Sequence, residues 1–149
     1  MAVFESRTEL AVSPEQLFDF ISRPANLQAI APPEMQMAFV NPPEVIVLGS
    51  QLTCKVVAYG QVQQLTYEIV EFDAPNRFRE KGIGGPLPKW IHDYIVESNS
   101  GQGAILLNRI EFEPPGGLLG FLVTEGKILD HLEEGFHHRR EALVKRLGA

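Results

Sequence analysis

Residues 113–149 read EPPGGLLGFLVTEGKILDHLEEGFHHRREALVKRLGA, in which a turn-forming Pro-Pro-Gly-Gly sequence precedes one long amphipathic segment. Apolar side chains recur in this segment mostly at steps of three and four residues, which is the spacing of one helix face. They are Leu118, Leu122, Leu129, Leu132, Phe136, Leu143 and Leu147. The pattern predicts a single C-terminal helix of about 30 residues, about 45 Å long.

The residues before this helix have the pattern of an antiparallel sheet, because short runs of alternating polarity are separated by turn sequences. We expect strands at 2–12, 51–59, 61–72, 77–81, 89–97 and 104–113, and residues 35–40 could form another. Two short helices are expected after the first strand. Ser13, Pro14 and Gln16 form a capping-box sequence at the start of the first helix. The second begins near Pro24 and ends before Pro32.

This order of elements predicts an α+β fold in which a long helix lies across a curved sheet and leaves a cavity between them. Charged residues indicate which way each strand faces, because an antiparallel sheet with one protected face alternates apolar and polar residues. Arg79, Asp93 and Arg109 should point outward. The residues between such charges should then point inward, namely Phe78, Glu80, Trp90, His92, Tyr94, Val96, Leu106, Asn108, Ile110 and Phe112.

Length and composition indicate one domain covering residues 1–149, with a formal net charge of −6. An acidic chain argues against nonspecific nucleic-acid binding, which depends on basic groups. The single cysteine, Cys54, excludes an internal disulfide and suits a reducing compartment, and its strand context favours a buried inert thiol. The sequence has no signal-peptide pattern and no apolar run long enough for a membrane span. We therefore expect a cytoplasmic protein without stable membrane insertion.

Several local sequences, spread over nearly the whole chain, carry a resemblance to a known superfamily. They are residues 4–18, 23–27, 85–92 (GPLPKWIH), 108–120 (NRIEFEPPGGLLG) and 136–139 (FHHR). Together with the order of elements they resemble the START-like superfamily, also called Bet v 1-like or SRPBCC. The likeness is greatest to its bacterial ligand-binding and polyketide cyclase-like members.

The resemblance implies a helix-grip fold, in which a seven-stranded, strongly bent antiparallel sheet holds the C-terminal helix. Between them lies a deep apolar cavity. Members bind lipids, polyketides and other hydrophobic molecules, and a minority catalyse cyclisation or dehydration. The fold by itself does not distinguish these activities.

The strongest set of inward polar residues consists of Glu80, His92, Tyr94 and Asn108, together with Tyr67 on the preceding strand. Glu80 and His92 should meet across a hairpin, because a buried carboxylate needs a partner. Three interpretations are open. The pair could be purely structural, it could orient the polar atoms of a ligand together with Tyr67 and Asn108, or it could transfer protons in catalysis.

The predicted function is binding of a hydrophobic small molecule (lipid-, polyketide- or aromatic-like) by a monomer or homodimer. The residues expected to contact it are Phe4, Leu65, Tyr67, Phe78, Trp90, His92, Tyr94, Asn108, Phe112, Leu122, Glu125, Leu129 and Phe136. Glu125 is included as the acid that falls on the apolar phase of the helix, whereas Arg140, on the same phase, is expected to extend to the domain edge.

Two alternatives belong to other classes of protein. One is a cofactor-independent polyketide cyclase or dehydratase that uses His92 and Glu80 as acid–base groups. The other is a chaperone-type interaction module, which would need an exposed apolar patch in place of a cavity. No cofactor is expected. No metal site is expected either, because His137 and His138 are adjacent on a helix and diverge by about 100°.

Overall fold

The computed structural model describes residues 1–149 as one seven-stranded antiparallel sheet with four α-helices and a short 3₁₀ helix at Pro33–Met35. The strands are β1 (Ala2–Leu10), β2 (Ala38–Phe39), β3 (Gln51–Ala58), β4 (Gln61–Asp73), β5 (Arg77–Gly84), β6 (Lys89–Ser98) and β7 (Ala104–Glu113). The helices are α1 (Pro14–Ile21), α2 (Pro24–Ile30), α3 (Gly117–Leu122) and α4 (Glu125–Leu147).

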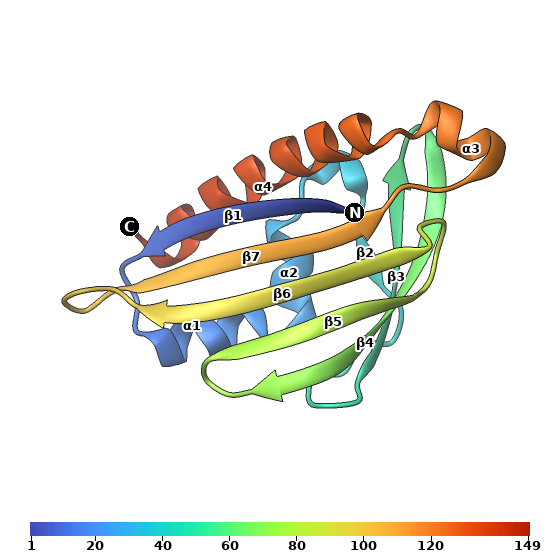
Figure 1. Cartoon of the computed structure of the whole chain (residues 1–149). Coiled ribbons are helices and arrows are strands. Elements are labelled where there is room, and N and C mark those ends of the chain that lie inside the picture. The colour runs from blue at the N-terminus through green and yellow to red at the C-terminus, as the bar shows by residue number, and fades with distance from the viewer.

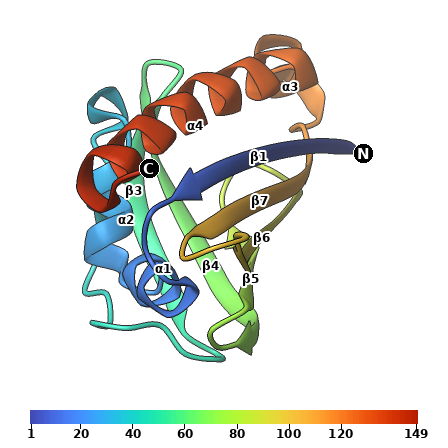
Figure 2. The same ribbon diagram turned by 90° about the vertical axis from the view of Figure 1, so that its left-hand side faces the viewer.

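The strand order in the sheet is β1-β7-β6-β5-β4-β3-β2. Strands β2 to β7 therefore pair in the order of the chain, and β1 forms the edge strand beside β7. The sheet curves strongly, and α4 lies across its concave face (Figures 1 and 2). Helices α1 and α2 lie toward the C-terminal end of α4, while α3 lies at its opposite end. This arrangement confirms the α+β helix-grip fold expected from the sequence.

The inward and outward faces agree with the charge pattern. Strand β1 alternates buried and exposed residues along its whole length. Glu80, His92, Tyr94 and Asn108 are all buried on the concave side. Period-two alternation therefore assigned the strand faces correctly.

Asp93 departs from the simple pattern, since it lies on the outer face and yet is only 5% exposed. Arg79 covers it and donates two hydrogen bonds to its carboxylate, from Nε at 2.7 Å and from Nη2 at 3.0 Å. Arg77 adds a longer ion pair at 3.8 Å. The outer face is thus partly closed by an ionic cluster across β5 and β6.

The short helices begin as their sequences indicate. The Ser13 hydroxyl accepts a hydrogen bond from the Gln16 backbone N–H at 3.1 Å, and the Gln16 side chain accepts one from the Ser13 N–H at 3.0 Å. This capping box satisfies two N–H groups that would otherwise lack partners. Leu17, Phe18 and Ile21 then point into the core.

The prediction of one uninterrupted C-terminal helix was wrong. The chain leaves helical geometry at Val123, and α4 begins after Thr124, whose hydroxyl accepts a hydrogen bond from the Lys127 N–H at 3.2 Å. An N-capping threonine followed by an acidic first turn is a helix start signal, and it divides the segment here. Helix α4 has 23 residues.

Helix α3 does not pack its apolar side chains into the core. Leu118 is 85% exposed, Phe121 81% and Leu122 67%, so the predicted apolar stripe is not buried over this part. Because Gly120 has no Cβ atom, α3 can fold back closely on the Pro114-Pro115 segment. A Cβ atom there would collide with the carbonyl oxygen of Pro115. None of the helices combines the length and the apolar character needed to cross a bilayer.

Strand β4 bends the sheet because its pairing with β5 is interrupted twice, between Thr66 and Tyr67 and between Ile69 and Glu71. Such bulges increase the local twist and turn a strand away from a flat sheet. At the first bulge Tyr67 lies opposite Gly82, against which the Trp90 side chain packs. A Cβ atom at Gly82 would lie 3.0 Å from that of Trp90.

Two separate apolar clusters fill the space between sheet and helices. The larger has 15 buried residues and joins α1 and α2 to the sheet and to Leu143 of α4. The smaller has 8 and joins β1 and β7 to Ile128, Leu132 and Phe136 of α4. Packing is therefore concentrated in two regions, and one helix does not fill the whole concave face.

A pair of phenylalanine substitutions should separate the packed core from the exposed helix. Phe78→Ala should lower the free energy of unfolding by about 3–5 kcal/mol, because Phe78 is fully buried and stacks on Tyr94 at 4.4 Å between ring centroids. Phe121→Ala on α3 should change it by about 0.5 kcal/mol or less. Urea denaturation measures both values. Equal losses in the two variants would contradict the packing described above.

Candidate functional site

A cavity of about 310 Å³ lies between α4 and the concave face of the sheet. Of the 32 residues that line it, 20 are hydrophobic. They come from nearly every element on the concave side, including α2, the segment at 33–39, β3 to β7, α3 and α4. An apolar concave site with few polar groups is the usual form of a small-molecule site.

The cavity opens to the surface beside α3. Tyr59, Leu119 and Leu122 line it and are also 48%, 42% and 67% exposed. The β5–β6 turn contributes Gly85 and Pro86 to the same rim. The mouth thus lies between α3, the end of the β3–β4 hairpin and the β5–β6 turn, at the end of the molecule opposite α1.

A row of polar side chains crosses three adjacent strands on the concave face, and two of its members, Glu80 and His92, line the cavity. Glu80 of β5 faces His92 of β6 in the strand register, and its Oε1 lies 3.3 Å from Nδ1 of the histidine. His92 Nε2 lies 2.8 Å from Oδ1 of Asn108 on β7. The sequence prediction that Glu80 and His92 meet across the hairpin is confirmed.

Both nitrogens of His92 are therefore occupied by protein groups. With the Asn108 oxygen toward the ring, Nε2 donates to that oxygen, and the proton between Nδ1 and Glu80 can lie on either group. With the amide turned, a neutral ring donates from Nδ1 to Glu80 and accepts at Nε2 from the amide N–H. In either arrangement no ring nitrogen is left free for a ligand.

Aromatic contacts hold the imidazole in place. It stacks on Tyr94 at 3.9 Å between ring centroids, and Tyr94 in turn stacks on Phe78. Phe136 of α4 meets the histidine ring edge-on at 5.8 Å. The ring is thus restrained on its faces and at both nitrogens.

Two tyrosines add hydroxyl groups to the wall. Burial raises the pKa of Tyr67 well above its usual value, and the charge of Glu80 raises it further. The same causes raise the pKa of Tyr94, although the charge and the N–H groups of Arg139 act in the opposite direction. Both phenols remain protonated at neutral pH and can donate hydrogen bonds.

Arg139 is a functional candidate that the sequence prediction missed. It lines the cavity from α4, and its guanidinium carbon lies 4.9 Å from the centre of the Phe136 ring. A signal was present, because Leu132, Phe136, Arg139 and Leu143 are spaced at steps of four, three and four. Arg140, which was expected to extend to the domain edge, instead donates a hydrogen bond to the hydroxyl of the buried Ser6 on β1 at 2.9 Å.

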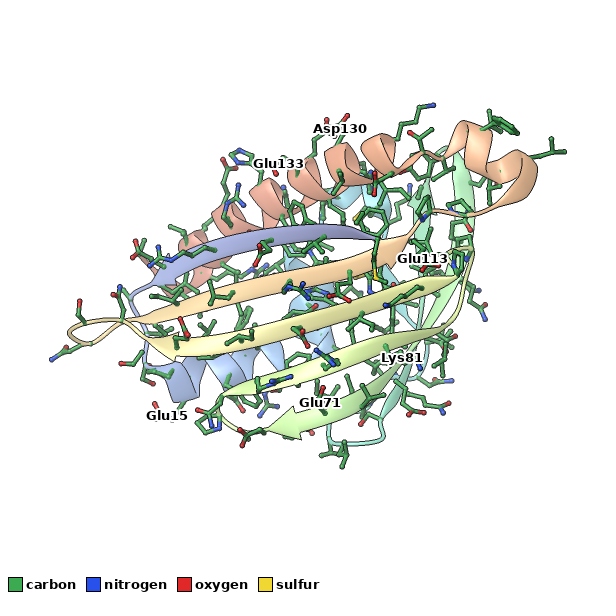
Figure 3. The ribbon with its side chains drawn as sticks, viewed as in Figure 1. Glu15, Glu71, Lys81, Glu113, Asp130 and Glu133 are labelled. Carbon is green, nitrogen blue, oxygen red and sulfur yellow. The ribbon has the colours of Figure 1, made fainter.

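The remaining sides of α4 carry most of its polar residues. Asp130 and Glu133 project from α4 away from the sheet (Figure 3). His137 pairs on the surface with Glu141, with Nε2 and Oε1 3.0 Å apart. Toward the cavity the helix presents an apolar face with two polar residues, His131 and Arg139.

The structure brings many of the predicted contact residues to the cavity. Those that line it are Leu65, Tyr67, Trp90, His92, Tyr94, Leu122 and Phe136. Glu80, predicted only as an acid–base group, lines it as well. The segment from 35 to 39 and strand β3 also contribute, through residues that the sequence prediction omitted. These are Met35, Met37, Phe39, Cys54, Val56 and Ala58.

Other predicted contact residues point inward but do not reach the cavity. They are Phe4, Phe78, Asn108, Phe112 and Leu129. Phe4, for example, packs on Phe136 with ring centroids 5.2 Å apart, and Phe112 is fully buried. Period-two alternation identifies the inner face of a strand, but it does not distinguish a cavity wall from solid packing.

The prediction that Glu125 faces the ligand was wrong. Glu125 is exposed and is the first residue of α4, beyond the cavity. An acidic residue in the first helical turn is stabilised by the helix dipole, which explains its position without a ligand. Glu125 falls in line with the apolar residues only if the helix is continuous through residue 124.

Comparison with known proteins supports the fold. A family model described as polyketide cyclase/dehydrase and lipid transport matches residues 1–147. Among curated proteins no match was found.

Three solved structures illustrate the range of similar folds. A Chromobacterium violaceum protein has a TM-score of 0.78 at 14% identity, with 100% of this chain and 99% of that chain covered. A START superfamily protein from Mycobacterium smegmatis has a TM-score of 0.72 at 15% identity, with 97% of this chain and 96% of that chain covered. The major latex-like protein 151 of Panax ginseng has a TM-score of 0.63 at 13% identity, with 96% of this chain and 97% of that chain covered.

Cys54 should be unreactive in the folded protein at neutral pH. Burial, and to a lesser extent the charge of Glu80, raises the pKa of its thiol to about 12, while Arg139 partly opposes the shift. The thiolate is the reactive species, so alkylation by iodoacetamide should be slow at neutral pH. The rate of alkylation should rise steadily with pH, whereas that of an ordinary thiol levels off above its pKa of about 8.5. Fast labelling in guanidinium chloride is the control, and an equally fast native reaction would contradict this environment.

Proposed function

Because the chain belongs to the polyketide cyclase/dehydrase and lipid transport family, we propose that it binds a hydrophobic small molecule in the cavity between α4 and the sheet. The observation that supports this proposal is the cavity itself, which has a volume of about 310 Å³ and a mainly apolar lining. The hydrophobic effect favours transfer of an apolar molecule from water into such a space, since apolar surface is removed from water on both sides. The ligand is lipid-, polyketide- or aromatic-like.

The dimensions favour a compact ligand. A volume of about 310 Å³ is at the lower end of the range of small-molecule sites, roughly 300–1,000 Å³. A single short chain or a small ring system suits it better than a two-chain lipid. The mouth beside α3 provides a route by which such a molecule reaches the interior.

A cavity-filling substitution tests this proposal. Ala58→Phe places a ring into the cavity from β3 and should remove binding, because the ligand and the new side chain compete for one space. The matched control is Val57→Phe, on the other face of the same strand. Native mass spectrometry and thermal shift after incubation with a lipid extract measure retention and stabilisation. No apolar molecule bound to wild type, or equal binding by Ala58→Phe, would contradict the proposal.

The contact between Glu80 and His92 supports a second candidate, a cyclase or dehydratase in which the pair transfers a proton. The geometry limits how this would work. Both ring nitrogens of His92 face protein groups, so a proton would have to pass through Glu80, which lines the cavity, or follow loss of the Asn108 contact. The third possibility, an interaction module with a filled interior, has less support because the interior contains a cavity.

Turnover of a linear poly-β-keto thioester, followed by absorbance of the cyclised product, tests the catalytic candidate. His92→Gln should abolish turnover while the variant still retains an apolar ligand, because the amide cannot accept a proton as imidazole does. Circular dichroism serves as the folding control. Unchanged turnover in His92→Gln would remove His92 from the mechanism.

A further inference from the structure

The cavity wall contains one carboxylate and one permanently charged cation, and their surroundings differ. Glu80 is next to His92, with 3.3 Å between Oε1 and Nδ1, and so has a partner inside the protein. Arg139 has no carboxylate within 4.0 Å, although five other arginines do. Those five are Arg7, Arg23, Arg77, Arg79 and Arg109.

The position of Arg139 is one in which an unpaired charge is costly. Its side chain is only partly exposed, and it extends along the Phe136 ring into the cavity lining. A cation removed from bulk water is stabilised by an aromatic face, but an anion stabilises it far more. The protein itself supplies no such anion at this point.

Arg139 shares the cavity wall with other hydrogen-bond donors, Tyr67, Tyr94 and Cys54. The charge of Arg139 lowers the pKa of each of these groups against the effect of burial. A guanidinium presents paired N–H groups that match the two oxygens of a carboxylate. The two protonated phenols in the same wall are further donors. The cavity wall thus contains the donors of an anion site.

We propose that the ligand carries a single carboxylate on a compact apolar body, and that Arg139 binds this carboxylate. The inference rests on the proposed binding function and adds the chemical class of the ligand. One cation matches one negative charge, and the carboxylate of Glu80 in the same wall disfavours a dianion such as a phosphate monoester. The apolar body then occupies the space between β3, β4 and α4.

The protein provides its own reporter for a test, because Trp90 is the only tryptophan and lines the cavity. Its fluorescence would be titrated at about pH 8, where a carboxylic acid is ionised. The probes are the straight-chain acids from octanoic to dodecanoic acid and the alcohols of the same lengths. We expect the best acid to bind at least about tenfold more tightly than its alcohol, the value of a charge-assisted hydrogen-bond pair.

Arg139→Gln should reduce the affinity for the acid by about tenfold or more and leave that for the alcohol unchanged. The matched control is Arg140→Gln, which changes the neighbouring arginine that hydrogen-bonds Ser6 and should alter neither affinity.

Three results would overturn the inference. If wild type binds alcohols as tightly as acids, or if Arg139→Gln weakens both equally, the carboxylate assignment is wrong while the cavity function stands. If neither series binds, the carboxylate assignment is also wrong, and the lipid-extract experiment with Ala58→Phe then decides the cavity function separately.

Discussion

The structure depends on one constraint, that a single helix covers the concave face of a strongly bent seven-stranded sheet. Helix α4 contacts the sheet through two apolar clusters, one toward α1 and α2 and one beside β1 and β7. Two bulges in β4 increase the local twist of the sheet beneath this helix. A helix about 10–12 Å across cannot fill that space with its own side chains. The cavity is therefore a consequence of how the sheet bends.

The polar groups of the wall are arranged so that most satisfy one another. Glu80, His92 and Asn108 form a row of close polar contacts across three strands, and the imidazole is further restrained by stacking on Tyr94. Such a row suits a rigid wall, whereas the buried Nε1 of Trp90 in the same wall has no hydrogen-bond partner. Arg139 has no carboxylate within 4.0 Å, and for this reason the helix, which supplies mostly apolar wall, contributes the most informative charge in the cavity.

Much of the fold could be predicted from local pattern. Alternation placed Glu80, His92 and Asn108 on the inner face, and the Ser13–Gln16 capping box located the first helix, because each signal acts within a few residues. The C-terminal helix was predicted less well. The apolar pattern runs through Val123 without interruption, whereas the Thr124 cap divides it, so Leu118 and Leu122 are exposed and Glu125 is outside the cavity.

The sequence alone was sufficient for the order of elements, the side of each strand that faces inward and the meeting of Glu80 with His92. These properties follow from periodicity and hairpin register, which are local. It could not distinguish wall from core among the inward residues. Phe78 and Phe112 are packed solid, whereas Tyr67 and Trp90 border empty space. That difference depends on where the bent sheet and the divided helix separate. The lack of a carboxylate within 4.0 Å of Arg139 has the same origin. Only the three-dimensional packing determines both.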